Sequence, residues 1–89
     1  MNAAAPLDIT VTDEGLSLVG EIDAHTAPAL AEAIEASGHD HLVIDMAGVE
    51  FLDSSGLRVL IEAHQTARAD DGTVQLANPS TAVSRLLEI

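Results

Sequence analysis

An unbroken apolar run in the middle of the chain, Leu42-Val43-Ile44, limits the possible folds more than any other feature of the sequence. Consecutive apolar residues are typical of a strand that is covered on both faces, whereas alternating apolar and polar residues indicate a strand with one solvent-exposed face. Polar residues flank the run, so we expect a short central strand that ends near Met46. The 89 residues of the chain suit one domain with a modest core around this strand.

The segment before the central strand predicts a hairpin and a helix. Apolar and polar residues alternate over residues 7–11 and again over 16–19, and Asp13-Glu14-Gly15 between them is a turn sequence, which favours an antiparallel pair. A helix is expected over residues 27–36, with Thr26 as its N-cap and Gly38 after its end. Its apolar stripe consists of Leu30, Ala33 and Ile34.

The segment after the central strand predicts a helix, a strand and a final helix. Residues 57–69 have helical periodicity, and their expected apolar side consists of Leu57, Leu60, Ile61 and Ala67. Asp70-Asp71-Gly72 ends this helix, residues 73–77 form a strand, and Asn78-Pro79-Ser80 begins the last helix. The last helix is expected to turn Val83, Leu86 and Leu87 inward.

This order of elements predicts an α/β fold. Strands that alternate with helices are joined by right-handed parallel crossovers. We therefore expect a small mixed β-sheet that consists of an initial hairpin followed by parallel strands and is packed against helices. The segment Asp53-Ser54-Ser55-Gly56 then lies in a strand-to-helix loop at the carboxyl end of a strand. Open α/β sheets present ligands and partners at this edge.

Two hydroxyl groups in this loop lie at a helix N-terminus. Unpaired N–H groups and the helix dipole make that place receptive to an anion, so a phosphoryl group could be accepted there. Asp, Ser and Gly are also ordinary capping residues. Ser55 is expected to cap the helix through its side chain, and Asp53 either bonds within its own loop or faces a partner.

The context of this loop resembles the signature of STAS domains, in particular bacterial anti-sigma factor antagonists. The resemblance lies first in residues 42–57, Leu-Val-Ile-Asp-Met-Ala-Gly-Val-Glu-Phe-Leu-Asp-Ser-Ser-Gly-Leu. Gly20-Glu21-Ile22-Asp23 is similar to the segment before the family's first helix, and Asn78-Pro79 to the start of its C-terminal helix. The similarity extends over almost the whole chain in the right order.

The resemblance implies a regulatory role. In that family an anti-sigma factor that is also a serine kinase phosphorylates the first Ser after the Asp, and the unphosphorylated antagonist binds this partner so that a sigma factor is released. Ser54 is therefore the expected phosphoacceptor, with Ser55 as its competitor. The expected partner-binding residues are Asp23, Asp53, Ser54, Ser55 and Gly56. A phosphatase remains open as a further partner.

STAS relatives of another type form the main alternative. These are accessory subunits of transporter ATPases or scaffolds in stress-signalling assemblies, which share the fold without requiring a phosphoswitch. Residues 1–6 are expected to be a loose leader and residues 7–89 a single STAS-like domain. Family members continue for another helical turn, a strand and a helix, so either the sequence is shortened at Ile89 or the C-terminal helix is absent.

The composition of the chain excludes several functions. The chain has three Arg, no Lys and 15 acidic residues, which gives a net charge of −12. This charge repels the phosphate backbone of a nucleic acid, so direct binding of DNA or RNA is disfavoured. A basic protein partner fits this charge, although acidity also serves solubility. Cysteine is absent, which excludes disulfides and thiolate chemistry. The sequence has neither a signal-peptide pattern nor an apolar stretch of membrane-spanning length, so a cytoplasmic protein is expected.

Catalysis and metal binding are not expected. A hydrolase would need a base such as His25 or His64 beside a serine, and the chain lacks a Gly-x-Ser-x-Gly motif. His39-Asp40-His41 is a solvated turn rather than a metal site, because three adjacent residues rarely converge on one ion. We therefore expect no enzyme activity, no cofactor and no metal.

Overall fold

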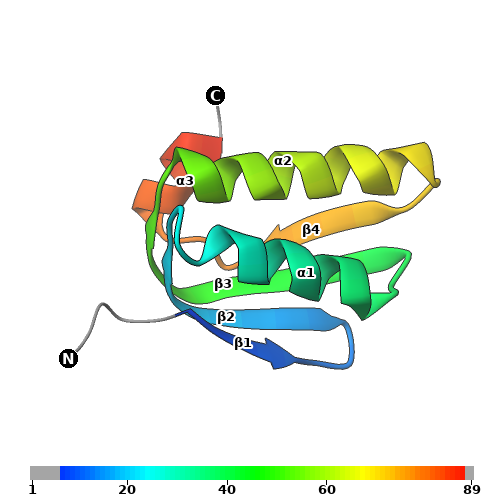
Figure 1. The fold of residues 1–89 in the computed structure, drawn as a ribbon, viewed down its shortest axis with the longest axis horizontal. Helices are drawn as coiled ribbons and strands as arrows, with labels where there is room; N and C mark the ends of the chain where they lie inside the picture. Colours follow the sequence, from blue (N-terminus) through cyan, green and yellow to red (C-terminus); the bar gives the residue numbers. More distant parts are fainter. Residues whose placement is uncertain (1–6, 88–89) are drawn as a thin grey trace.

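Four strands form one mixed sheet in the computed structural model, which describes residues 7–87. Strands β1 (Asp8–Val11) and β2 (Gly15–Ile22) are the antiparallel hairpin, while β3 (His41–Leu52) and β4 (Thr73–Ala77) continue the sheet in parallel, in the order β1-β2-β3-β4. Figure 1 shows this order across the molecule. The predicted α/β class, the hairpin and the parallel strands are confirmed, and the expected leader lies outside the described residues.

Three helices connect or follow the parallel strands. Helix α1 (Ala27–Ser37) joins β2 to β3, α2 (Ser54–Ala69) joins β3 to β4, and α3 (Thr81–Leu87) follows β4. Both crossovers step in the same direction across the sheet, so right-handed connections bring α1 and α2 to the same face (Figure 1). The core lies between this face and the helices and consists of Leu16, Leu18, Ile22, Leu30, Leu42, Ile44, Met46, Val49, Leu52, Leu60 and Val83.

The central strand departs from the expectation in two ways. Leu42 and Ile44 are buried under the helices, but Val43 between them is only half-buried, because both crossover helices cover the same face. The strand also runs to Leu52 instead of ending near Met46. Its second half pairs with β2 through two register shifts. A Cβ at Gly48 would meet Val19 Cγ2 at 2.7 Å, so the missing side chain permits this close pairing.

The apolar side expected for the second helix is partly wrong. Leu60 is 3% exposed, as predicted, but Ile61 is 47% exposed and faces away from the sheet. The core-facing side of α2 includes the buried Gly56 and the half-buried Val59 instead. Helical periodicity is correct here, but the rotation of the helix about its axis depends on where it contacts the sheet.

The helix ends and the last helix are mostly as expected. Gly38 follows α1 in the left-handed conformation, with φ of 68°. Helix α2 ends before Asp70-Asp71-Gly72, as predicted. In α3, Val83 is buried, while Leu86 is 38% exposed rather than inward, and the side chain of Leu87 lies outside what the structure describes.

Candidate functional site

The carboxyl ends of β2 and β3 lie side by side, as Figure 1 shows at the edge from which α1 and α2 begin. Ile22 and Leu52 are partners in the parallel register, and the Asp53 N–H donates to the Ile22 carbonyl oxygen at 3.1 Å. Asp23 and Asp53 therefore begin two neighbouring loops at the same edge of the sheet. The structure brings together these two residues, which are far apart in the sequence.

Asp53 is the N-cap of α2. Its carboxylate oxygen Oδ1 accepts hydrogen bonds from the backbone N–H groups of Ser55, at 2.8 Å, and Gly56, at 3.2 Å. The residue has the extended backbone that caps prefer, with φ of −104° and ψ of −174°. The prediction that the Ser55 side chain caps the helix is therefore wrong. The Asp53 carboxylate already accepts from the N–H groups of Ser55 and Gly56 in the first turn.

The two serines differ in accessibility. Ser54 is the first residue of α2 and is exposed, whereas Ser55 is half-buried. An enzyme that modifies a hydroxyl must reach it, so this difference favours Ser54 as a substrate.

Gly56 lies at the closest approach between α2 and the sheet. It is buried, and a Cβ at this position would lie 2.5 Å from Leu52 Cδ1 and 3.0 Å from Ile22 Cβ. A side chain would push the first turn of α2 away from the ends of both strands. Gly56 therefore sets the placement of the two serines and is too buried to supply much contact area to a partner.

Asp23 holds the neighbouring loop together. Its Oδ1 accepts hydrogen bonds from the backbone N–H groups of His25, at 2.9 Å, and Thr26, at 3.0 Å. The hydrogen bond from the Thr26 N–H is the main reason why the pKa of Asp23 lies below its ordinary value. Thr26 precedes α1 but makes no side-chain cap bond, because its Oγ1 accepts from the Asp23 N–H at 3.0 Å and donates to the Glu21 carbonyl at 2.9 Å.

A shallow, open hollow of about 400 Å³ adjoins the exposed serine. It lies between the starts of α1 and α2 and is lined by Ala24, Ala27, Pro28, Ser54, Ser55, Arg58 and Val59. Arg58 is the only charged residue in this lining. Arg58 was not among the predicted site residues, because the helix was expected from Leu57 and Ser54 was expected in the loop before it. The helix in fact begins at Ser54, so Arg58 lies four residues after Ser54 on the same helix.

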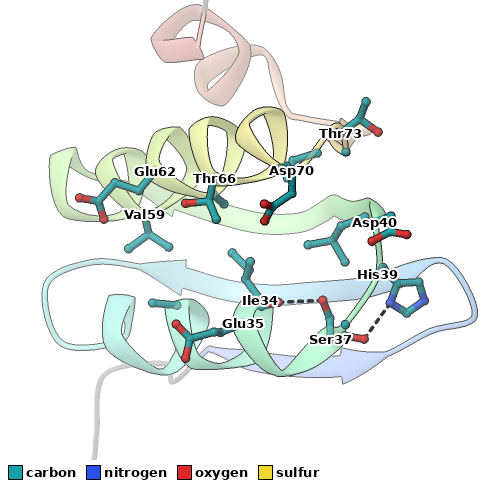
Figure 2. A pocket seen from close by; sticks show the side chains of 17 residues that line it. Ile34, Glu35, Ser37, His39, Asp40, Val59, Glu62, Thr66, Asp70 and Thr73 are labelled. Carbon is teal, nitrogen blue, oxygen red and sulfur yellow. Dashed lines mark hydrogen bonds between the residues drawn. The ribbon is translucent and has the colours of Figure 1, made fainter.

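A second groove runs between α1 and α2 from Val59 toward the carboxyl ends of these helices, and its lining contains none of the predicted site residues. Figure 2 shows Ile34 of α1 and Val59 of α2 pointing into the gap between these helices, with the carboxylates of Glu35, Glu62 and Asp70 around it. Its volume is about 380 Å³. The groove offers apolar walls and carboxylates, but the serines that carry the predicted chemistry lie at the other end of α2.

Neither His25 nor His64, the two candidate bases, forms a described hydrogen bond to Ser54 or Ser55. His64 lies ten residues after Ser54, about 15 Å along the helix axis. His25 is exposed, and among the described hydrogen bonds its ring contacts neither serine. The His39 ring lies within hydrogen-bond distance of the Ser37 and Asp13 carbonyl oxygens. The His41 ring instead lies within hydrogen-bond distance of Thr73 Oγ1.

Residues 7–87 were not found to contain a metal-ligand cluster or a membrane-spanning helix. This part of the chain holds no cluster of three or more His, Cys, Asp or Glu residues arranged to bind a metal ion. Among the described helices, none combines the length and the apolar character needed to cross a bilayer.

Comparison with known proteins defines the class. The sequence pattern of the family described as "Mlab, STAS domain" matches residues 6–89, so the chain belongs to the STAS domain family. Anti-sigma-F factor antagonist RsfB of Mycobacterium tuberculosis is 46% identical over 67 residues, which cover 67% of this chain and 55% of that protein. The chain thus spans little more than half the length of this relative.

Two further comparisons cover the chain more completely. The anti-sigma-B factor antagonist of Listeria monocytogenes is 34% identical over 93 residues, covering 100% of this chain and 82% of the relative. The crystal structure of an anti-sigma factor antagonist from Mycobacterium paratuberculosis superimposes with a TM-score of 0.68 at 33% identity, covering 99% of this chain and 82% of the other. The predicted STAS family and its fold are confirmed.

Proposed function

We propose that this protein is a cytoplasmic anti-sigma factor antagonist with a phosphoswitch at Ser54. In this proposal the unphosphorylated form binds an anti-sigma factor that has serine kinase activity, and a sigma factor is released. The kinase transfers the γ-phosphoryl group of ATP to Ser54 Oγ, the hydroxyl loses its proton, and ADP leaves. The names of the related antagonists support the kind of partner.

The exposed Ser54 hydroxyl on the capped first turn of α2 is the observation that carries the proposal. The two hydrogen bonds to Asp53 keep this turn in place, and the bond from Asp53 to Ile22 ties it to the end of β2. A partner that contacts the Asp23 loop would therefore contact Ser54 as well. Asp23, Asp53 and Ser54, with the half-buried Ser55, form the proposed partner-binding surface, and Gly56 shapes it from below.

A phosphate on Ser54 would change binding without refolding the protein. Phosphoserine adds about −1.5 to −2 charges at pH 7. The N-terminus of a helix stabilises an anion by about 0.3–2 kcal/mol, so the fold tolerates the group. In an interface the same dianion must lose its water, and each 1.4 kcal/mol of cost weakens binding about tenfold. A desolvation cost of a few times ~1.4 kcal/mol would therefore reduce the affinity for the partner enough to abolish the complex.

Protein binding fits the chain better than nucleic-acid binding or catalysis. The net charge of −12 opposes contact with phosphate backbones and favours a basic partner surface. The serines form no described hydrogen bond to a histidine that could activate them, as a hydrolytic mechanism would require. A phosphatase that removes the phosphate from Ser54 would complete the cycle.

The test uses the purified chain with candidate anti-sigma kinases and ATP, followed by mass mapping of the phosphate. We expect modification at Ser54, normal folding but at least tenfold weaker kinase binding of Ser54→Asp, and binding without phosphorylation of Ser54→Ala. Ser55→Ala is the matched control and should still be phosphorylated. Phosphate on Ser55 alone, or none with a cognate kinase, would refute the assignment. Co-purification with a transporter ATPase would instead support a role as an accessory subunit.

A further inference from the structure

Arg58 lies one helical turn after Ser54 in the same shallow hollow. Side chains four residues apart in a helix are neighbours, with Cβ atoms roughly 5–6 Å apart. An arginine is long enough to bridge this gap, and its planar guanidinium matches the geometry of a phosphate. The other residues of the lining carry no charge, so Arg58 is the only cation within the hollow.

We propose that Arg58 forms an ion pair with the phosphate of phosphorylated Ser54 and holds this group on the first turn of α2. This ion pair rests on the proposed function only in that Ser54 carries a phosphate, and it does not depend on which partner the protein binds. The order of charges supports it, because an acidic group four residues before a basic one on a helix is the favourable arrangement.

Neighbouring carboxylates compete only weakly for Arg58. Asp53 already uses its Oδ1 for the N–H groups of Ser55 and Gly56. Glu62 lies four residues after Arg58, which is the less favourable order for an ion pair, and it does not line the hollow that holds Ser54. Asp23 belongs to the neighbouring loop and binds the N–H groups of that loop. A phosphate with nearly two negative charges should therefore attract Arg58 more strongly than these groups.

The ion pair has a measurable consequence for the phosphate. The second proton of phosphoserine leaves with a pKa of about 6, and a cation beside the group favours the dianion. Removing the cation should raise this pKa by about 0.2–0.4 unit, a 1.5- to 2.5-fold change in acidity, as expected for an i, i+4 ion pair on a helix.

The test is a pH titration of the phosphorus NMR signal of protein that carries phosphoserine at position 54, installed during synthesis without a kinase. Arg58→Gln should raise the phosphate pKa by the stated amount, and Arg58→Lys should retain most of the wild-type value. Arg68→Gln is the matched control, because Arg68 lies in the last turn of the same helix, about 20 Å along the axis from Ser54. It should leave the pKa unchanged.

Two results would overturn the ion pair. One is an equal phosphate pKa in the wild type and Arg58→Gln, and the other is an equal rise in Arg58→Gln and Arg68→Gln, which would reflect net charge alone. Thermal melts establish that each variant is folded during the titration. The phosphate is installed chemically, so the titration does not test whether a partner kinase phosphorylates Ser54. Conversely, a negative kinase assay would refute phosphorylation at Ser54 without bearing on the ion pair.

Discussion

Replacing Asp53 by Ala should destabilise the first turn of α2 and identify the residue that caps this helix. The carboxylate accepts hydrogen bonds from two backbone N–H groups, at 2.8 and 3.2 Å. Loss of an N-cap costs about 0.5–2 kcal/mol, and loss of a negative charge at the positive end of the helix adds about 0.3–1 kcal/mol. We expect a total loss of about 1–3 kcal/mol in the free energy of unfolding.

This loss is large enough to measure by thermal or urea unfolding followed by circular dichroism. For a domain of 60–100 residues, 1 kcal/mol lowers the midpoint by about 4–8 °C, so Asp53→Ala should melt about 4–24 °C below the wild type. Asp53→Asn retains an acceptor oxygen and should lose only the smaller charge contribution. Ser55→Ala should change stability by less than about 0.5 kcal/mol. If Ser55→Ala were as destabilising as Asp53→Ala, the capping geometry described above would be incorrect.

Three further outcomes are expected. Gly56→Ala should lower the free energy of unfolding by about 1–2 kcal/mol in urea titrations, since crowding against Ile22 and Leu52 outweighs the helix propensity of Ala; unchanged stability would contradict the close approach. The pKa of Asp23 is lowered mainly by the Thr26 N–H, so its ionised form stabilises the fold at neutral pH. The stability difference between wild type and Asp23→Asn should therefore shrink as the pH falls below about 4, and a constant difference down to pH 2 would refute this. Association with a basic anti-sigma partner should slow markedly between low and high salt in stopped-flow measurements, and a salt-independent rate would exclude electrostatic steering.

Local sequence patterns were sufficient for the order of the strands and helices. Alternation over residues 7–11 and 16–19 led to the hairpin, and the spacing of apolar residues led to the helices, because these periods follow from backbone geometry. A helix start was correctly expected after Asp53, but the helix begins at Ser54 rather than at Leu57, so Ser54, Ser55 and Gly56 form its first turn instead of a loop. The expected end of the central strand near Met46 was wrong, because pairing with β2 continues the strand to Leu52.

The sequence by itself determined which segments become strands and helices, the acidity of the surface and the helix start that carries Ser54. Only the tertiary structure decided that Ile61 faces solvent and that Asp23 lies at the same edge of the sheet as Asp53 and Ser54. The physical reason is that the rotation of a helix about its axis and the alignment of strand ends depend on contacts between segments distant in the chain. Here those contacts are the pairing of β2 with β3 and the close approach of α2 to the strand ends at Gly56.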